Sequence, residues 1–265
     1  MSSEDCWKES EKDIGFFEYE LDSWECFGEF INKIMLQYTN YIYRGHGDER
    51  WKLEPTVDRI VGDSSSYIRE EHLTRFKYET RSRRGNNPPE LKDDNDWWAL
   101  GQHHGLLTPL LDWTQSPFVA LFFAVSTALK EKTKKCSVYA LWQGGVNIIN
   151  ENIKESDKIE NINNRKPTVK IFRPLSDENN RLVNQRGLFT RGPNNMTLEE
   201  WVPKFSQNIE RINNLMILIK ITIPSNDLEN CLRYLNRMNI NDSTLFPDLT
   251  GASIHCNNYL SINNY

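Results

Sequence analysis

Apolar residues recur every three or four positions in several stretches of the chain, which is the spacing of a helix with one face on a core. In the first such stretch, Ser23 is placed to cap a helix that continues to Tyr38, and Asn40 ends it. Ser116 followed by Pro117 marks a second start, because serine suits the cap and proline the first helical position. Helices are predicted over residues 23–38, 68–82, 117–129, 177–184 and 224–238, with a further helical start at 97.

Runs rich in β-branched and aromatic residues predict strands between these helices. One of them is Tyr41-Ile42-Tyr43, which ends at Arg44-Gly45 and so places Arg44 at the end of a strand. The run from 215 to 223 is apolar enough to lie in the centre of a sheet. Strands are predicted over residues 41–43, 110–114, 136–142, 168–172, 187–190 and 215–223.

Strands separated by helices, several of them short and irregularly joined, indicate an α+β (mixed α/β) fold with a mostly antiparallel central sheet flanked by helices. The 265 residues suffice for one large domain or two small ones. We expect residues 1–20 to be a polar N-terminal segment and residues 21–265 a single domain. Within it, residues 83–96 are expected to be an exposed loop, residues 144–167 an insertion or loop, and residues 168–265 the C-terminal sheet and helices.

Charge and composition narrow the class of protein. The formal net charge is -5 at pH 7, so no overall basic field attracts nucleic acid or an anionic membrane. The longest nearly apolar run, Pro117–Leu129, is shorter than the roughly 20 residues that span a bilayer. Residues 1–13 are acidic and polar, which is not the pattern of a secretory signal or a transit peptide. We therefore expect a cytoplasmic protein that does not interact with membranes.

The 5 cysteines are an odd number, and no two of them have the spacing of a Cys-x-x-Cys metal knuckle. Free and mostly packed thiols are therefore expected, and no metal site is predicted.

Arg44 beside Gly45 is suited to binding a phosphate or diphosphate, because a guanidinium makes two charge-assisted hydrogen bonds and glycine lets a ligand approach the backbone. Asp112 lies between Leu111 and Trp113, and a carboxylate in an apolar stretch requires a partner. Arg44 is a candidate for that partner, and such a pair would hold two segments together without any role in chemistry. The sequence leaves both interpretations open.

His103 and His104 are neighbours, so only one of them can point inward. A histidine that titrates near neutrality suits proton transfer, but a hydrogen-bonded core histidine has the same sequence pattern. Asp248 follows Pro247 and is expected to cap the next helix. The basic residues between 77 and 84 fit either a phosphate-binding patch or a solvated helix end.

Three blocks of residues follow one another in a specific order. They are Tyr43-Arg44-Gly45 with Trp51, Leu53 and Pro55; Trp98-Ala99-x-Gly101-Gln102-His103-His104-Gly105-Leu106 with Leu110-Leu111-Asp112-Trp113-Thr114; and Ser116-Pro117 with Ala120-Leu121-Phe122-Phe123-Ala124. In this order they resemble the FRG family, closely over residues 40–130. The segments 185–190 and 245–249 are similar to C-terminal segments of full-length members. The chain departs from the family at Leu107 and Pro109, where a proline and a basic residue are common.

The block order is also similar to that of arginine-type ADP-ribosyltransferases, in which an early strand carries arginine, a middle segment carries hydroxyls before an alanine-rich helix, and a late strand carries a carboxylate or its substitute. In this position the chain has Gln185, which can hydrogen-bond a ribose hydroxyl but cannot act as a base. The resemblance implies an ADP-ribosyltransferase-like fold with NAD as the substrate and no metal. The implied catalytic residues are Arg44, His103, Asp112 and Gln185, and the implied NAD-binding residues are Tyr43, Arg44, Gly45, Trp113, Thr114 and Ser116.

The function that follows is a toxin-like or antiviral-defence transferase that cleaves NAD and transfers ADP-ribose to RNA, DNA or protein, with an antitoxin protein as a further partner. Two other functions fit the same residues. In a phosphodiesterase or nuclease, His103 and Asp112 would act as acid and base while Arg44 holds the scissile phosphate. In a non-catalytic sensing module, the same polar residues would bind a ligand without turnover.

Overall fold

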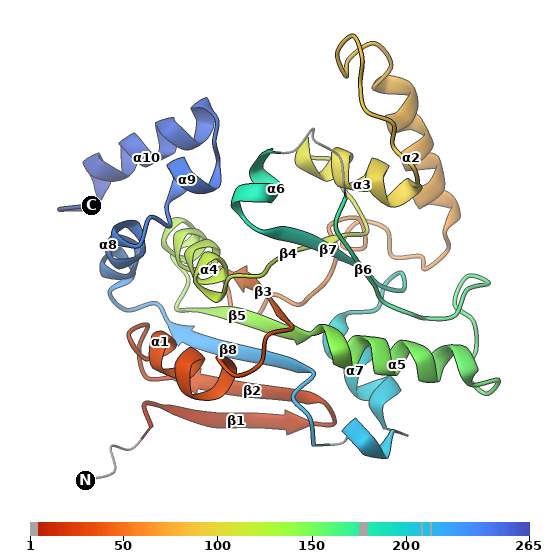
Figure 1. The fold of residues 1–265 in the computed structure, drawn as a ribbon, viewed down its shortest axis with the longest axis horizontal. Coiled ribbons are helices and arrows are strands. Elements are labelled where there is room, and N and C mark those ends of the chain that lie inside the picture. The colour runs from red at the N-terminus through yellow and green to blue at the C-terminus, as the bar shows by residue number, and fades with distance from the viewer. Residues whose placement is uncertain (1–4, 175–179, 208, 213) are drawn as a thin grey trace.

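A single mixed sheet organises the computed structural model, which describes residues 5–174, 180–207, 209–212 and 214–265. Its order is β1-β2-β8-β5-β3-β4-β7-β6 (Figure 1), and all neighbours are antiparallel except the parallel pair β2 and β8. This confirms the expected α+β fold with a mostly antiparallel sheet. The strands are β1 (Trp7–Asp13), β2 (Phe16–Leu21), β3 (Tyr41–His46), β4 (Leu111–Thr114), β5 (Lys135–Trp142), β6 (Lys170–Phe172), β7 (Gly187–Arg191) and β8 (Leu218–Pro224).

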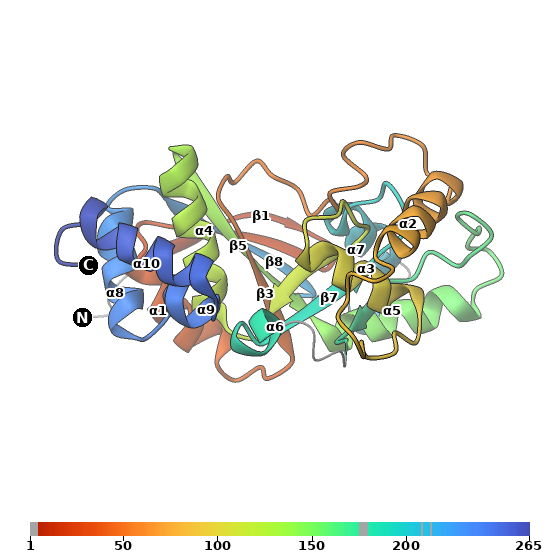
Figure 2. The same ribbon diagram turned by 90° about the horizontal axis from the view of Figure 1, so that it is seen from above.

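Helices cover both faces of the sheet and extend beyond its ends (Figure 2). Residues of β3 alternate between the two faces, with Tyr41 and Tyr43 in the core under α4 and Ile42 in the core under α5 and α7. The helices are α1 (Cys26–Phe30), which continues as the π-helix η1 (Ile31–Met35), α2 (Tyr67–Glu79), α3 (Asp94–His103), α4 (Pro117–Glu131), α5 (Gln143–Glu155), α6 (Asn180–Asn184), α7 (Leu198–Ser206), the 3-10 helix η2 (Glu210–Ile212), α8 (Leu228–Arg237), α9 (Asp242–Leu245) and α10 (Leu249–Ser261).

Several elements form where the sequence pattern predicted them. The Ser116 Oγ accepts a hydrogen bond from the Val119 N–H, so Ser116 caps α4 as expected. Asp248 caps α10 by accepting from the Gly251 N–H. The β8 strand lies between β2 and β5, and its apolar side chains are buried on both faces. Strand β3 continues three residues beyond the predicted run, so Arg44 lies within the strand and not at its end.

The polar N-terminal segment is part of the sheet. Its residues form β1 and β2, and β2 pairs in parallel with β8. Of β2, only Phe17 and Leu21 are buried, and the residues between them, including Glu18 and Glu20, are partly exposed. A polar composition is therefore compatible with a strand that has one face in water.

The helices α5 and α7 were missed by the sequence pattern, as was the short helix α9. The stretch expected to be a loop at 144–167 begins with α5, which buries Val146, Ile149 and Ile153 at helical spacing. Gly144, Gly145 and the surrounding asparagines masked this spacing. Helix α7 was not predicted either, although Thr197 and Glu200 form a reciprocal capping box at its start. Of the predicted helix 177–184, residues 177–179 lie outside the described residues, and the remainder forms α6.

The start of α1 differs from the expectation in two ways. Glu25 occupies the cap position without a side-chain hydrogen bond, while the Ser23 Oγ lies 3.7 Å from the Cys26 Sγ. Cys6 and Cys26 are joined in a disulfide, with Cα atoms 6.0 Å apart, so the expectation that all cysteines are free is wrong. The fold brings this pair together from opposite ends of the β1–β2 hairpin, which spacing alone did not reveal. Cys136 and Cys231 are buried free thiols.

Within the described ranges, no helix combines the length and apolar character that crossing a bilayer requires.

Candidate functional site

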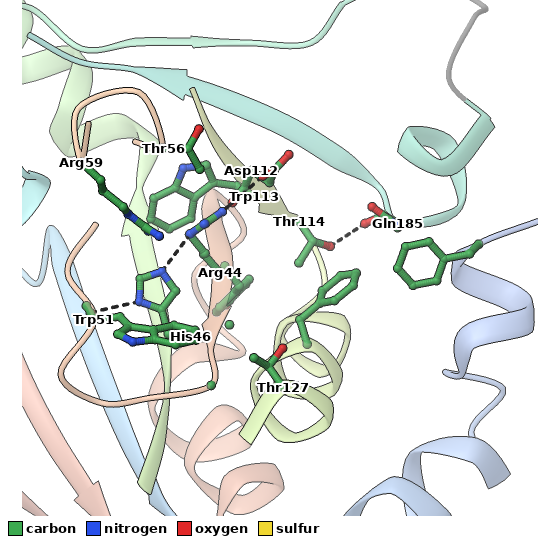
Figure 3. A pocket seen from close by; sticks show the side chains of 15 residues that line it. Arg44, His46, Trp51, Thr56, Arg59, Asp112, Trp113, Thr114, Thr127 and Gln185 are labelled. Carbon is green, nitrogen blue, oxygen red and sulfur yellow. Dashed lines mark hydrogen bonds and ion pairs between the residues drawn. The ribbon is translucent and has the colours of Figure 1, made fainter. Parts of the chain in front are cut away.

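A cavity of about 360 Å³ opens where β3 and β4 separate (Figure 3). The two strands pair only at Tyr43 and Thr114, and beyond this pair the side chain of Arg44 bridges the gap between them. Helix α4, the segment from Trp51 to Arg59 and the chain around α9 complete the walls. Seven of the residues predicted from the sequence line this cavity: Tyr43, Arg44, Gly45, Asp112, Trp113, Thr114 and Gln185.

The guanidinium of Arg44 is held from two sides. Its Nη1 donates to the Asp112 carbonyl at 2.7 Å and lies 3.5 Å from the Asp112 carboxylate, while its Nε donates to His46 Nε2 at 3.0 Å. Within the described residues, Nη2 has no hydrogen-bond partner. Burial lowers the pKa of Arg44, and the Asp112 charge opposes this effect, so the guanidinium stays charged. Arg44 therefore offers oriented donors to the cavity.

His46 fixes the direction of Arg44 and is itself fixed. Its Nε2 accepts from Arg44, so the ring proton must be on Nδ1, which donates to the Trp51 carbonyl at 3.1 Å. The side chain is 3% exposed, and burial together with the Arg44 charge lowers the pKa of His46 to about 3. The imidazole is consequently neutral at physiological pH.

A second guanidinium, that of Arg59, points into the same cavity (Figure 3). Its Nη2 donates to the Glu54 carbonyl at 3.2 Å, and its charge contributes to the lowered pKa values of Arg44 and His46. The cavity lining thus contains two arginines and a single carboxylate, that of Asp112. This excess of positive charge favours an anionic ligand.

Aromatic rings provide the apolar part of the lining. Trp51 is 41% exposed, whereas Tyr43 and Trp113 are buried, at 5% and 3%. The Trp113 Nε1 donates to Thr190 Oγ1 within the core, and burial raises the pKa of Tyr43 to about 12. Trp51 therefore presents more ring surface to the cavity than the two aromatic residues predicted from the sequence.

Hydrogen bonds of Gln185 hold the part of the cavity wall that includes Thr114 and Phe246. Thr114 Oγ1 donates to the Gln185 carbonyl at 2.6 Å, and Gln185 Nε2 donates to the Leu245 carbonyl at 3.1 Å. The second bond fixes the segment that carries Phe246, another lining residue. Both Thr114 and Gln185 thus have structural partners as well as a place in the cavity.

Gly45 is required for packing against α4. A Cβ built at Gly45 would lie 2.0 Å from the Ala120 carbonyl oxygen and 2.6 Å from the Ala124 nitrogen. The sequence predicts that this glycine lets a ligand approach the backbone. The contact that actually excludes a side chain is with the helix backbone.

His103 and Ser116 are not among the described residues that line this cavity, so the fold does not bring them together with Arg44 and Asp112 there. His103 ends α3 with its ring 4.8 Å from that of His104, and burial and the neighbouring His104 lower its pKa. Ser116 uses its hydroxyl to cap α4. Both residues are close to Asp112 in sequence, but the irregular segments 104–110 and 115–116 separate them from the part of β4 that lines the cavity.

Sequence reasoning missed His46, Trp51 and Arg59. A signal existed for His46, because residues two apart on a strand share a face and Arg44 had been singled out. No pattern identified Arg59, which lies in the turn at residues 56–60 and lines the cavity only because of the fold.

A network of buried hydrogen bonds holds the segment that carries Trp51, on the side away from the cavity. Glu199 of α7 accepts from the Leu53 N–H at 2.9 Å and also hydrogen-bonds Tyr139. The Tyr139 hydroxyl lies 3.3 Å from the Trp51 carbonyl, and its ring packs against His46. Burial raises the pKa of Glu199 despite these bonds. The network connects α7 to the segment that orients His46 and hence Arg44.

No cluster of three or more His, Cys, Asp or Glu side chains suited to a metal ion occurs in the part of the chain that the structure describes. The groups in the cavity that are suited to a cofactor-sized anion are the guanidiniums of Arg44 and Arg59 and the ring of Trp51.

Residues 39–133 match the model of the FRG domain. The match runs from just before β3 to just after α4, so it contains Arg44, His46, Arg59 and Asp112 and leaves Gln185 outside. No curated protein and no solved structure matches the chain. The likeness of the fold to ADP-ribosyltransferases therefore has no structural match to support it.

Proposed function

We propose that this chain, which carries an FRG domain at residues 39–133, is an ADP-ribosyltransferase that cleaves NAD and transfers ADP-ribose to a macromolecule. The observation that carries the proposal is the convergence of Arg44, Arg59 and Asp112 on one cavity that also exposes the Trp51 ring. The toxin-like or antiviral-defence role, with an antitoxin as a further partner, is part of the proposal and rests on the FRG resemblance.

The two arginines bind the pyrophosphate of NAD. Arg44 has free donors on Nη2, and its Nε and Nη1 bonds keep the planar group from rotating. A guanidinium in a fixed plane makes paired charge-assisted hydrogen bonds to phosphate oxygens. Arg59 supplies a second positive charge from the opposite wall. Trp51 stacks on the nicotinamide or adenine ring.

The reaction breaks the bond between ribose C1′ and the nicotinamide nitrogen. The bonding electrons pass to the pyridinium ring, which leaves as neutral nicotinamide, and positive charge develops on the ribose. Asp112 has 62% of its side chain exposed and faces the cavity from β4. Its carboxylate stabilises that positive charge electrostatically. A nucleophile of the acceptor then bonds to C1′ and releases one proton, with Asp112 as the nearby group to accept it.

The test uses NAD labelled in its adenylate part, incubated with the protein and a cell lysate. The wild type should release nicotinamide and attach label to protein or nucleic acid. Arg44→Ala and Asp112→Ala should each lower this transfer by about 100-fold or more, because each removes a charge that acts on the transition state. Asp112→Ala should keep the melting temperature within a few degrees, since its side chain is 62% exposed, and Arg44→Ala, which leaves the buried His46 without its donor, is assayed below the onset of its own thermal unfolding.

Arg75→Gln is the matched control, because Arg75 is 74% exposed, pairs only with Glu71 and does not line the cavity. It should transfer label like the wild type. Release of free ADP-ribose without labelled macromolecule would refute transfer, and full activity of both cavity variants would refute the site.

A further inference from the structure

A second cavity, of about 230 Å³, lies at the other end of β7 from the Arg44 cavity. Gln185 precedes the start of β7 and lines the first cavity, whereas Arg191 at the end of the strand lines the second. The two cavities share no lining residue. Its basic lining residues are Arg165, Lys166, Lys170 and Arg191, and none of the lining residues that the structure describes is an aspartate or glutamate.

Arg191 is held in position without a carboxylate partner. Its Nη1 donates at 2.9 Å to Oδ1 of Asn95, a side chain that is 8% exposed. Among the described residues, its Nε and Nη2 have no hydrogen-bond partner, and no carboxylate lies within ion-pair distance. Burial and the nearby charge of Arg165 lower the pKa of Arg191, while the charges of Asp94, Asp93 and Glu70, none of them within ion-pair distance, act in the opposite direction. Two guanidiniums that repel each other are thus kept close together.

The other two basic residues add charge to the same place. Lys166 Nζ donates to the carbonyls of Ser156 and Ile159, at 2.6 Å and 2.9 Å, so it has no acidic partner in the described part of the chain. Lys170 pairs with Asp93 at 3.2 Å across the rim. The cavity therefore retains a positive charge that its own lining does not neutralise.

The walls are fixed before any ligand arrives. The side-chain amides of Asn163 and Asn194 both donate to the Ser64 carbonyl, the second at 2.9 Å. Behind them the fully buried Arg69 donates to Asp58 at 2.6 Å and to Asn195 Oδ1 at 2.7 Å. These bonds tie together three segments distant in sequence, so the backbone that carries Arg165 and Arg191 is held in place before a ligand binds.

We propose that this cavity binds a phosphate group, either of a free nucleotide or of a nucleic acid strand. Phosphate oxygens accept from the free guanidinium edges of Arg191 and Arg165 and neutralise their mutual repulsion. Lys166 and Lys170 add long-range attraction. This proposal does not depend on the ADP-ribosyltransferase chemistry of the Arg44 cavity.

Fluorescence anisotropy tests it with a labelled single-stranded RNA oligonucleotide, followed by competition with AMP and with inorganic phosphate. Arg191→Gln and Arg165→Gln should each weaken RNA binding by about tenfold. Each should also reduce the slope of the logarithm of the binding constant against the logarithm of the salt concentration by about 1, as loss of one phosphate contact does. Lys8→Gln is the charge-matched control, because Lys8 is 71% exposed on β1 at the opposite edge of the sheet. It should bind like the wild type.

The arms of the experiment separate the sources of phosphate. Displacement of RNA by AMP supports a site for a free nucleotide, and RNA binding that AMP does not displace supports a strand. Arg165 is exposed, so Arg165→Gln remains informative if Arg191→Gln lowers the melting temperature. Arg44→Ala should retain the binding, which separates this result from failure of the NAD chemistry. Equal binding by wild type and both variants, absence of binding, or equal binding of a polyglutamate peptide would overturn the proposal.

Discussion

Arg44 depends on its neighbour two residues along the strand. His46 Nε2 accepts a hydrogen bond from Arg44 Nε, and His46 Nδ1 donates one to the Trp51 carbonyl. The two bonds hold the arginine in one orientation before a ligand binds. This arrangement requires a neutral imidazole, because an imidazolium has no acceptor for the Arg44 N–H. Protonation of His46 would therefore break the bond and place two positive charges side by side.

The first prediction concerns stability against pH. The pKa of His46 is about 3 in the folded protein and near 6.5 when unfolded, so below 6.5 the unfolded chain binds the additional proton. Stability is complete above that pH and decreases as the pH falls toward 3, by about 2 kcal/mol between pH 7 and pH 5. His46→Gln removes the titration, and its amide still accepts from Arg44. Urea unfolding at pH 7 and at pH 5 measures the free energy of unfolding. Between these two pH values the wild type should lose about 2 kcal/mol more of it than the variant. An equal loss in both proteins would contradict the assignment.

At the scale of elements, the approach of α4 to β3 forms the inner wall of the cavity. The Ala120–Ala124 turn of α4 lies directly on Gly45, and Thr127 lies on Gly47. Small residues on both elements let the helix backbone lie close to the strand. This contact sets the distance between α4 and Arg44, which is next to Gly45 on the strand.

The second prediction follows from this contact. Gly45→Ala should destabilise the protein by about 3 kcal/mol or more, because the new Cβ overlaps helix backbone that cannot move as a side chain would. Gly28→Ala is the matched control, since a Cβ there meets no atom within 4 Å and alanine favours the helix. It should be neutral or stabilising by up to about 1 kcal/mol. Urea unfolding measures both, and similar stabilities for the two variants would show that the helix can move away.

At the scale of the whole molecule, the site depends on segments that are far apart in sequence. The 51–59 segment carries Trp51 and Arg59, and it is anchored by Glu199 from α7, 146 residues after Leu53. Gln185 likewise anchors Leu245, 60 residues later. The FRG match covers β3, β4 and α4, which line the cavity, while Glu199 and Gln185 lie outside it.

The third prediction tests the Glu199 anchor. Glu199→Ala should cost about 1–3 kcal/mol, because the Leu53 N–H loses its acceptor in a buried place. It should also weaken the proposed binding of NAD, because Trp51 would move. Glu151→Ala is the control, since Glu151 is 65% exposed in a 3.7 Å pair with Arg211 and should cost less than about 1 kcal/mol. If calorimetry finds equal losses in both variants, the network does not support the wall.

The sequence by itself determined the elements whose signals are local. The β3 run, the Ser116-Pro117 start of α4 and the apolar β8 strand follow from propensity, capping and burial, which neighbouring residues decide. It also singled out Arg44 and Asp112, which line the cavity as a pair, although Asp112 is 62% exposed and not buried as its apolar neighbours suggested.

Only the tertiary structure decided which side chains share a cavity. Arg59 lines the cavity and His103 does not, because turns and packing between distant segments set where each side chain points. No sequence periodicity encodes these directions. The Cys6–Cys26 disulfide and the Glu199 anchor arise in the same way. The physical reason is that contacts between remote segments depend on the path of the whole backbone, whereas capping and periodicity depend on a few adjacent residues.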